Sequence, residues 1–294
     1  MKIGITGSTG LIGSALLPAL RAAGHEPLSY VRRPATAPGE RQWSGTDLAP
    51  DAVADLDAVV HLAGAGVGDK RWTAAYKKQI LDSRLLGTQA VARAVAAAGV
   101  PTLLSASAIG YYGDTGDVPT DETGRLGAGF LAEVCAEWEG ATAAADRSAR
   151  VVHLRTGIVL SAAGGALRKQ LPIFKAGLGA PLGTGRQWLS WISLADEVAA
   201  IEHLLTADVS GPVNLVAPTP VTNRDFTKAL GKAVHRPTLP VAVPGFVLRA
   251  ALGTFAEEGV LTGQRLSPAV LSKSGFTFRH PDLASGLEAG LAQQ

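Results

Sequence analysis

The chain has 294 residues, of which 47% are hydrophobic and 18% are charged, and its formal net charge is +2. The charged share lies below the roughly 25% of an average globular protein, so the chain can bury a sizeable core, and the small net charge gives no indication of a nucleic-acid partner. The single cysteine, Cys135, excludes an internal disulfide and favours a reducing compartment.

The first half of the chain alternates short apolar segments with longer helical ones. We expect strands at 2–6, 26–31, 57–62, 101–106 and 151–155, with helices at 11–23, 73–97 and 129–147 and a less regular one near 50–54. The strands are apolar on both faces, as buried parallel strands are, and the alternation is typical of βαβ units. The predicted fold class is therefore α/β, with a Rossmann-type doubly wound parallel sheet and a smaller C-terminal substrate-side region.

A glycine-rich turn joins the first strand to the first helix. It reads Gly7-Ser8-Thr9-Gly10-Leu11-Ile12-Gly13. Glycines in this position let the backbone approach a pyrophosphate, and the helix N-terminus offers free N–H groups to the phosphates. A plain strand-to-helix turn is the alternative. We expect the cofactor to lie across Gly7, Thr9, Gly10, Leu11, Ile12 and Gly13.

The second strand ends on two arginines, Arg32 and Arg33. An acidic residue at this place accepts the ribose 2′-OH of NAD(H), whereas an arginine suits the 2′-phosphate of NADP(H). Arginine binds phosphate well because its planar fork donates two hydrogen bonds. The pair predicts NADP(H) as the cofactor, although a solvated basic loop would look the same.

The next two strands end on small residues that belong beside the cofactor. The third strand runs into Leu62, Ala63 and Gly64, and the fourth carries Ser105 and Ala106. Open α/β sheets bind ligands at the carboxyl ends of their strands. We therefore expect Leu62, Ala63 and Gly64 to flank the nicotinamide half of the cofactor, with Ser105 and Ala106 nearby.

The second half of the chain does not continue the regular alternation of strands and helices. Glycines and prolines cluster through 164–185, after which we expect a strand at 188–192, a helix at 195–206, a strand at 213–216 and helices at 223–233, 246–252 and near 282–291. We divide the chain into a cofactor-binding domain at 1–240, with substrate-side elements mainly from 160 onward, and a small C-terminal domain at 241–294. No apolar stretch reaches membrane-spanning length and the first strand begins at residue 2, so we expect a soluble cytoplasmic protein without a signal segment or a membrane partner.

Several further motifs occur in a characteristic order. They are His61-Leu62-Ala63-Gly64, Asp69-Lys70-Arg71-Trp72, Ser83-Arg84, Ser105 to Gly113, Arg155 to Leu160, Trp191 to Asp196 and Gly263 to Pro268. With the glycine turn, they make most of the chain resemble an extended short-chain dehydrogenase/reductase. More narrowly, the chain is similar to the atypical, sugar-nucleotide epimerase-like branch called epimerase family proteins. That branch carries a small C-terminal domain of unassigned function, for which residues from about 245 onward would account.

The resemblance breaks at the proton-transfer pair. Most members of the superfamily use Tyr-x-x-x-Lys on a helix, where the lysine lowers the pKa of the tyrosine. None of the four tyrosines has a lysine four residues later, and no lysine lies between Lys78 and Lys169. The family register places Leu131 and Cys135 at the two positions, and a shift of one residue places Phe130 and Val134 there. Neither register restores the pair.

Other residues must therefore carry catalysis, if there is any. Ser107 corresponds to the assisting serine of the family, and Tyr111 and Tyr112 offer a phenol from another direction. A hydroxyl that caps the strand end is the alternative for Ser107, and packing is the alternative for one of the tyrosines. Arg84 would anchor an anionic substrate group or pair with a carboxylate, and Arg186 lies where extended members build their substrate pocket.

These observations predict an NADP(H)-dependent oxidoreductase or epimerase-like enzyme that lacks the Tyr-x-x-x-Lys pair. A non-catalytic NADP(H)-binding sensor or regulatory protein is the alternative. The expected partner is a small-molecule substrate, a carbonyl compound or a nucleotide-sugar. The six histidines are dispersed, so we expect no metal site, and the sequence does not indicate an oligomeric state.

Overall fold

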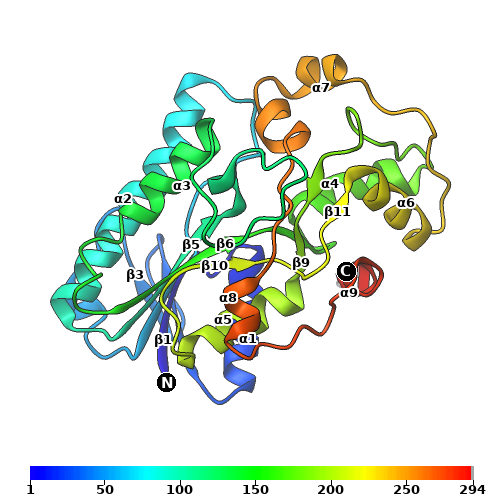
Figure 1. The fold of residues 1–294 in the computed structure, drawn as a ribbon. Helices are drawn as coiled ribbons and strands as arrows, with labels where there is room; N and C mark the ends of the chain where they lie inside the picture. Colours follow the sequence, from blue (N-terminus) through cyan, green and yellow to red (C-terminus); the bar gives the residue numbers. More distant parts are fainter. Residues whose placement is uncertain (293–294) are drawn as a thin grey trace.

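The computed structural model describes residues 1–292, in which seven strands form one parallel sheet (Figure 1). Their order across the sheet is β10-β6-β5-β4-β1-β2-β3. The strands are β1 (Lys2–Thr6), β2 (Glu26–Val31), β3 (Glu40–Gln42), β4 (Ala58–His61), β5 (Thr102–Ala108), β6 (Arg150–Thr156) and β10 (Gly211–Leu215). The order of the strands reverses between β1 and β4, which places a ligand crevice at their carboxyl ends. The predicted Rossmann-type sheet is confirmed.

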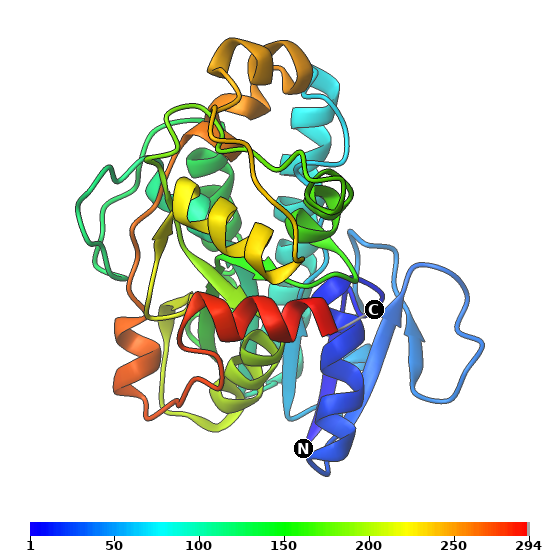
Figure 2. The same cartoon turned by 90° about the vertical axis from the view of Figure 1, so that its right-hand side faces the viewer.

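Helices cover both faces of this sheet (Figure 2). One face carries α1 (Leu11–Ala22), α5 (Leu194–Thr206) and α8 (Ala269–Lys273), and the other carries α2 (Ala74–Ala98) and α3 (Phe130–Gly140). Successive strand residues point to opposite faces, so the central strands β4, β5 and β6 contribute to both hydrophobic clusters. Val60 and Leu104 belong to the α1–α5 cluster, whereas Val59 and Leu103 belong to the α2 cluster.

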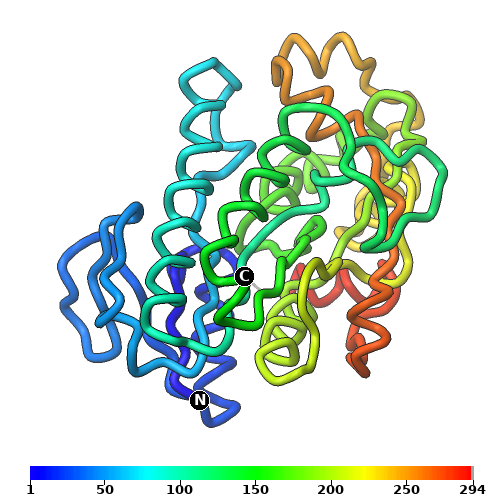
Figure 3. Tube along the Cα trace, turned by 60° about the vertical axis from the view of Figure 1, so that its left-hand side comes forward, coloured from blue at the N-terminus to red at the C-terminus, as the bar shows by residue number. Residues whose placement is uncertain are grey.

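A second group of elements lies beyond the carboxyl edge of the sheet. It contains two small sheets, β7 with β9 in parallel and β8 with β11 antiparallel. Its members are β7 (Ile158–Leu160), α4 (Gly165–Lys175), β8 (Trp188–Leu189), β9 (Trp191–Ser193), β11 (Val221–Thr222), α6 (Asn223–Ala233), α7 (Gly245–Leu252) and α9 (Leu283–Ala292). Shorter helical turns are η1 (Pro50–Ala52), η2 (Ile109–Tyr112) and the π-helical η3 (Glu257–Leu261). In the three ribbon and tube views α7 lies at the opposite end of the molecule from the N-terminus (Figure 3).

The elements differ from the sequence-based expectations in several places. The helix expected at 129–147 ends at Gly140 and continues as turns, and the one near 50–54 is the short η1. Helix α4 was not expected, because glycines and prolines cluster through 164–185; the helix begins at Gly165 and contains Pro172. It forms nevertheless, since it buries Leu167, Leu171 and Phe174 against the second group of elements.

The expected strand at 188–192 is interrupted at Ser190, which separates β8 from β9. The buried hydroxyl of Ser190 donates to the carbonyl oxygen of Gln264 (2.8 Å) and accepts from the N–H of Leu266 (3.0 Å). The interruption therefore anchors the C-terminal segment to the body of the molecule.

The C-terminal segment shares its core with the rest of the chain. Leu271 belongs to the cluster between α1, α5 and the sheet, and Leu283 and Leu287 belong to the cluster around Trp191. Within residues 1–292, no helix is long and apolar enough to cross a membrane.

Candidate functional site

A cleft of about 750 Å³ opens at the carboxyl ends of β1, β2 and β4. Its walls are the glycine turn, the end of β2, the loop after β3, and the loop after β4 together with the first turns of α2. The lining residues are Gly7, Ser8, Thr9, Gly10, Tyr30, Val31, Arg32, Arg33, Trp43, Ser44, Gly45, Thr46, Leu62, Ala63, Gly64, Ala65, Gly66, Asp69, Lys70, Tyr76, Gln79 and Ser83.

The glycine turn has no room for side chains at two of its positions. Gly7 has a φ of +69°, and a Cβ there would lie 2.7 Å from the carbonyl carbon of Leu62. A Cβ on Gly13 would lie 2.3 Å from the carbonyl oxygen of Gly7. This packing brings the N-terminus of α1 to the cleft, and no side chain caps that helix end at Gly10. Free N–H groups at a helix N-terminus suit a phosphate, so the turn fits the dinucleotide predicted from the sequence.

Most of the residues expected at the cofactor lie in or next to this cleft. Gly7, Thr9, Gly10, Arg32, Arg33, Leu62, Ala63 and Gly64 line it. Leu11, Ile12 and Gly13 form the first turn of α1 behind it, whereas Ser105 and Ala106 lie in β5, outside the lining. The Ser105 hydroxyl is buried without a hydrogen-bond partner within residues 1–292.

The two arginines after β2 have different surroundings. Arg33 donates to Glu40 through both terminal nitrogens, at 2.8 and 2.5 Å. The hydrogen bond from Arg33 lowers the pKa of Glu40 to about 2, so this pair is charged at neutral pH. Arg32 is exposed at the cleft and forms no ion pair with any residue that the structure describes. Arg32 is therefore the guanidinium that remains free for a ligand phosphate.

Sequence reasoning did not identify the loop from Trp43 to Thr46 or the side chain of Lys70 as parts of the cleft. The loop follows β3, a strand of three residues with the sequence Glu-Arg-Gln, which shows no apolar run. Lys70 lies in the loop after β4, where a cation in the sequence looks like any solvated surface charge. Only the folded chain brings these residues beside the glycine turn.

The turn after β4 is held by side chains from α2. The N–H of Ala65 donates to Ser83 Oγ (3.1 Å), and the Tyr76 hydroxyl donates to the carbonyl oxygen of Gly66 (2.5 Å). Arg84 Nη1 donates to the carbonyl oxygens of Ala65 (2.9 Å) and Ile80 (3.2 Å). Of the two roles expected for Arg84, pairing with a carboxylate is not found among the described residues.

The positions of the missing proton-transfer pair face the end of β5. A Cβ on Gly110 would lie 3.2 Å from Leu131 Cβ and 3.6 Å from Cys135 Sγ. Phe130 and Val134 belong to the cluster around Trp72, which Leu131 also contacts, and neither supplies the atoms nearest to such a Cβ. The geometry therefore favours the register with Leu131 and Cys135. Burial raises the pKa of the Cys135 thiol to about 12, so this thiol is protonated at neutral pH.

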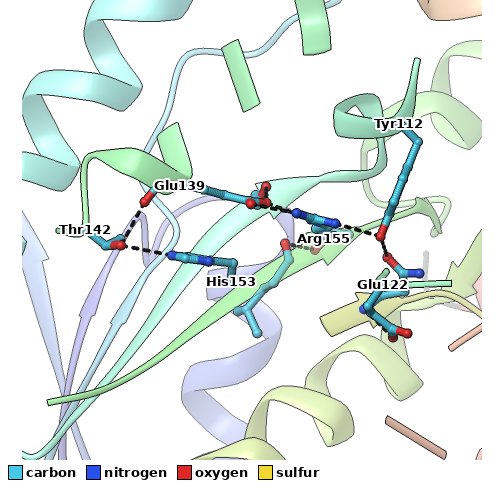
Figure 4. A network of polar contacts seen from close by, with 10 residues as sticks. Tyr112, Glu122, Glu139, Thr142, His153 and Arg155 are labelled. Carbon is cyan, nitrogen blue, oxygen red and sulfur yellow. Dashed lines mark hydrogen bonds and ion pairs between the residues drawn. The ribbon is translucent and has the colours of Figure 1, made fainter. Parts of the chain in front are cut away.

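Ser107 joins a buried polar network around Glu139 and Arg155, two residues that Figure 4 labels. Its hydroxyl donates to Glu139 Oε1 (2.6 Å), and the same carboxylate receives two hydrogen bonds of 2.8 Å from Arg155. Ser107 and Arg155 are adjacent in the register of β5 and β6, and Glu139 reaches them from α3. Ser107 therefore lies near the carboxyl end of β5 but outside the cleft lining.

The two tyrosines lie at the other side of Arg155. The Tyr112 hydroxyl accepts from Arg155 Nη1 (2.9 Å) and donates to Asn214 Oδ1 (2.7 Å). Burial raises the pKa of Tyr112 to about 12. Tyr111 is partly buried, and its ring lies 3.5 Å from Arg155 Cζ. Within residues 1–292, no hydrogen bond is formed by the Tyr111 hydroxyl.

Two remaining expectations concern Arg186 and metal ions. Arg186 is exposed and is not among the residues that line the cleft, and its backbone N–H donates to Thr184 Oγ1 (3.2 Å). In the part of the chain that the structure describes, no group of three His, Cys, Asp or Glu residues has the arrangement of a metal site.

Family models match two parts of the chain. Residues 3–216 match the NAD dependent epimerase/dehydratase family, and residues 243–289 match a domain of unknown function, DUF1731. The epimerase family protein MT2273 of Mycobacterium tuberculosis is 50% identical over 289 residues, which cover 97% of this chain and 96% of that protein.

Solved structures agree with the sequence comparisons. The crystal structure of human epimerase family protein SDR39U1 with NADPH superimposes with a TM-score of 0.90 at 32% identity, covering 99% of both chains. MoeE5 in complex with UDP-glucuronic acid and NAD has a TM-score of 0.79 at 22% identity, covering 100% of this chain and 97% of the other. The second likeness concerns the fold alone.

Proposed function

Because the chain belongs to the NAD dependent epimerase/dehydratase family, we propose that it is an NADP(H)-dependent oxidoreductase or epimerase-like enzyme without the Tyr-x-x-x-Lys pair. The observation that carries the proposal is the free guanidinium of Arg32 at one end of a cleft whose centre is the glycine turn. The human relative crystallised with NADPH supports the same cofactor.

In this proposal the cofactor lies along the cleft, with its 2′-phosphate at the end of β2 and its nicotinamide at the end of β4. Arg32 binds the 2′-phosphate, the N-terminus of α1 at Gly10 binds the pyrophosphate, and the turn from Leu62 to Gly64 lies along the nicotinamide half. The bound nicotinamide supplies hydride chemistry, and the protein supplies orientation and electrostatics. A cytoplasmic location remains part of the proposal and rests on the single, buried Cys135.

The proton path is proposed among Ser107, Tyr111 and Tyr112. Tyr111 is the phenol that has its hydroxyl available, because the hydroxyl of Tyr112 already accepts from Arg155 and donates to Asn214. Ser107 donates to Glu139, so its contribution would be to hold the charged network against which Tyr111 stacks. The proposed substrate class is a small carbonyl compound or a nucleotide-sugar, in line with membership of the epimerase/dehydratase family.

The test combines cofactor titration with a substrate screen. Carbonyl compounds and nucleotide-sugars are incubated with NADPH, and its oxidation is followed by absorbance. For any substrate found, Tyr111→Phe should lower kcat by about 10²- to 10⁴-fold, as expected when one positioned acid–base group is lost. Tyr30→Phe is the matched control, because the Tyr30 hydroxyl donates to the carbonyl oxygen of Ala52, which lies outside the cleft lining.

Three outcomes separate the alternatives. If Ser107→Ala, Tyr111→Phe and Tyr112→Phe all turn over as fast as the parent, the proposed proton path is wrong. If NADPH binds tightly but no substrate is turned over, a non-catalytic NADP(H)-binding sensor is the better description. If NADPH does not bind, the cofactor assignment itself fails.

A further inference from the structure

Arg84 is a partly buried guanidinium below the turn that follows β4, directly behind Gly64, which lines the cleft, although Arg84 itself is not among the lining residues. A Cβ on Gly64 would lie 3.4 Å from Arg84 Cζ, so the absence of a side chain at Gly64 makes room for this cation. On its other side, Arg84 Cζ lies 4.7 Å from the centre of the Trp138 ring on α3. The guanidinium is thus enclosed by α2, α3 and the cleft turn.

The charge of Arg84 lacks a counter-ion among the residues that the structure describes. Its hydrogen bonds go from Nη1 to two backbone carbonyl oxygens, those of Ala65 and Ile80. No acceptor within residues 1–292 receives a hydrogen bond from its Nε or Nη2. The ionisable groups nearest to it are the thiol of Cys135 and the phenol of Tyr76, and burial lowers the pKa of the guanidinium from its usual value.

An enclosed, uncompensated charge of this kind is costly unless something else compensates it. An arginine keeps its charge at all ordinary pH values and carries five N–H donors, several of which are here unused. A ligand with electron-rich oxygen atoms would supply both the acceptors and the missing negative potential. Binding of such a ligand would therefore stabilise the buried charge of Arg84 more than it would stabilise the charge of an exposed arginine, which water already solvates.

The order of the residues along the cleft indicates which part of the cofactor lies near Arg84. Arg32 marks the 2′-phosphate end at β2, and Gly10 marks the pyrophosphate above β1. Gly64 follows β4, and Cys135 faces the end of β5, so Arg84 lies beyond the pyrophosphate at the reacting end. We propose that Arg84 binds the oxygen atoms of the nicotinamide half of the cofactor. Arg84 on α2 would thereby supply a cation in place of the family's lysine, whose position on α3 is occupied by Cys135. This inference rests on the proposed function.

The experiment compares a whole cofactor with a fragment of it. NADPH contains the nicotinamide half, whereas adenosine 2′,5′-bisphosphate contains only the 2′-phosphate end. Isothermal titration of both ligands is carried out on the parent, on Arg84→Met, on Arg84→Lys and on Arg93→Met. Arg93 is an exposed arginine on the same helix and serves as the matched control.

We expect Arg84→Met to weaken NADPH binding by about 10- to 100-fold, the usual range for the loss of a hydrogen bond to a charged group. Binding of adenosine 2′,5′-bisphosphate should stay within about twofold of the parent, because this fragment does not reach Arg84. Arg84→Lys should retain more NADPH affinity than Arg84→Met, and Arg93→Met should change neither ligand. NADH should be weakened by Arg84→Met as much as NADPH.

Two results would overturn the inference. Unchanged NADPH affinity in Arg84→Met would mean that the guanidinium does not reach the cofactor, and equal weakening of NADPH and the bisphosphate would mean that Arg84 only supports the cleft turn. If Arg84→Met does not fold, Arg84→Lys and Arg84→Gln give the same comparison. A parent protein that binds the bisphosphate but not NADPH contradicts this inference, whereas one that binds neither contradicts the proposed function.

Discussion

Arg32 and Arg33 are neighbours in the sequence, but only Arg33 has an ion-pair partner in the part of the chain that the structure describes. Glu40 accepts two hydrogen bonds from Arg33, while the side chain of Arg32 stays exposed at the cleft. We therefore expect Arg32→Ala to weaken NADPH binding by about 10- to 100-fold, since one charge-assisted contact to the 2′-phosphate is lost. NADH binding should change little, because NADH carries no 2′-phosphate.

The matched control for this prediction is Arg33→Ala, which removes the same charge one residue away. It should reduce the preference for NADPH over NADH much less than Arg32→Ala does. Titration of both cofactors into the parent and the two variants gives the preference directly. Equal NADPH and NADH affinities in the parent would contradict the 2′-phosphate assignment for either arginine.

Glu197 is a fully buried carboxyl group on α5. Its Oε1 accepts from the Thr156 hydroxyl (2.8 Å), and its Oε2 has no hydrogen-bond partner within residues 1–292. Burial raises its pKa to about 8 from an ordinary value of 4.5. Between these two values the folded protein holds a proton that the unfolded chain has lost, so stability falls as pH rises through this range.

We expect Glu197→Gln to remove this part of the pH dependence, because glutamine resembles the protonated carboxyl and does not titrate. The free energy of unfolding of the parent should fall by up to about 1.4 kcal/mol per pH unit across the window, and the slope should be smaller in the variant. Urea denaturation at several pH values measures both slopes. Parallel slopes in parent and variant would show that Glu197 does not titrate in this window.

The network around Arg155 joins elements that are distant in the chain. Glu139 from α3 pairs with Arg155 from β6, which also donates to Tyr112 from η2 (Figure 4). Tyr112 in turn donates to Asn214 in β10. The side chain of Arg155 is 4% exposed, so removal of its charge would leave Glu139 as a nearly buried, unpaired carboxylate. The network therefore fixes the position of α3 against β5 and β6.

We expect Arg155→Met to lower the free energy of unfolding by about 3–5 kcal/mol, the usual cost of breaking a buried ion pair from one side. The double variant Glu139→Gln with Arg155→Met should lose less than the sum of the two single variants, because no unpaired charge is left. Thermal and urea denaturation of the three variants measure this coupling. Additive losses would mean that the pair contributes no interaction energy of its own.

The elements that could be predicted from the sequence are those with a local signal. Helix α6 was predicted with its observed bounds of 223–233, since Thr222 caps its N-terminus and apolar residues repeat along one face. Strand β1 and the turn at Gly7 were likewise predicted correctly. Helix α4 was missed because the residues that it packs against are remote in the sequence, and strand β3 was missed because its three residues, Glu-Arg-Gln, show no apolar run.

The candidate site likewise contains residues that the sequence identifies by position and contacts that only the folded chain creates. The glycine turn and Arg32 have positional signatures, and both line the cleft. The ion pair that occupies Arg33 could not be predicted, because Glu40 reaches it only through the folding of β3 beside β2. The same holds for Arg84, whose neighbours come from three separate segments of the chain.

The C-terminal segment covers apolar surfaces on several parts of the molecule. Leu271 packs between α5 and the sheet, and Leu287 packs near Trp191, where a Cβ on Gly286 would lie 2.2 Å from that ring. Leu266 packs beside Tyr112, against the end of the central sheet. A chain that ends at residue 240 would expose all of these surfaces to water.

We expect a chain truncated after residue 240 to lose cooperative unfolding. Burial of each large apolar side chain contributes about 1.5–3 kcal/mol, and the four leucines Leu266, Leu271, Leu283 and Leu287 together approach the total stability of about 5–15 kcal/mol of a typical protein. Circular dichroism on heating and NADPH titration measure the outcome. The control is Phe246→Ser, which alters a side chain of the same segment that is 70% exposed and should leave the transition unchanged. A truncated chain that melts cooperatively and binds NADPH like the parent would instead make residues 241–294 a separate domain, as predicted from the sequence, and would assign cofactor binding to residues 1–240 alone.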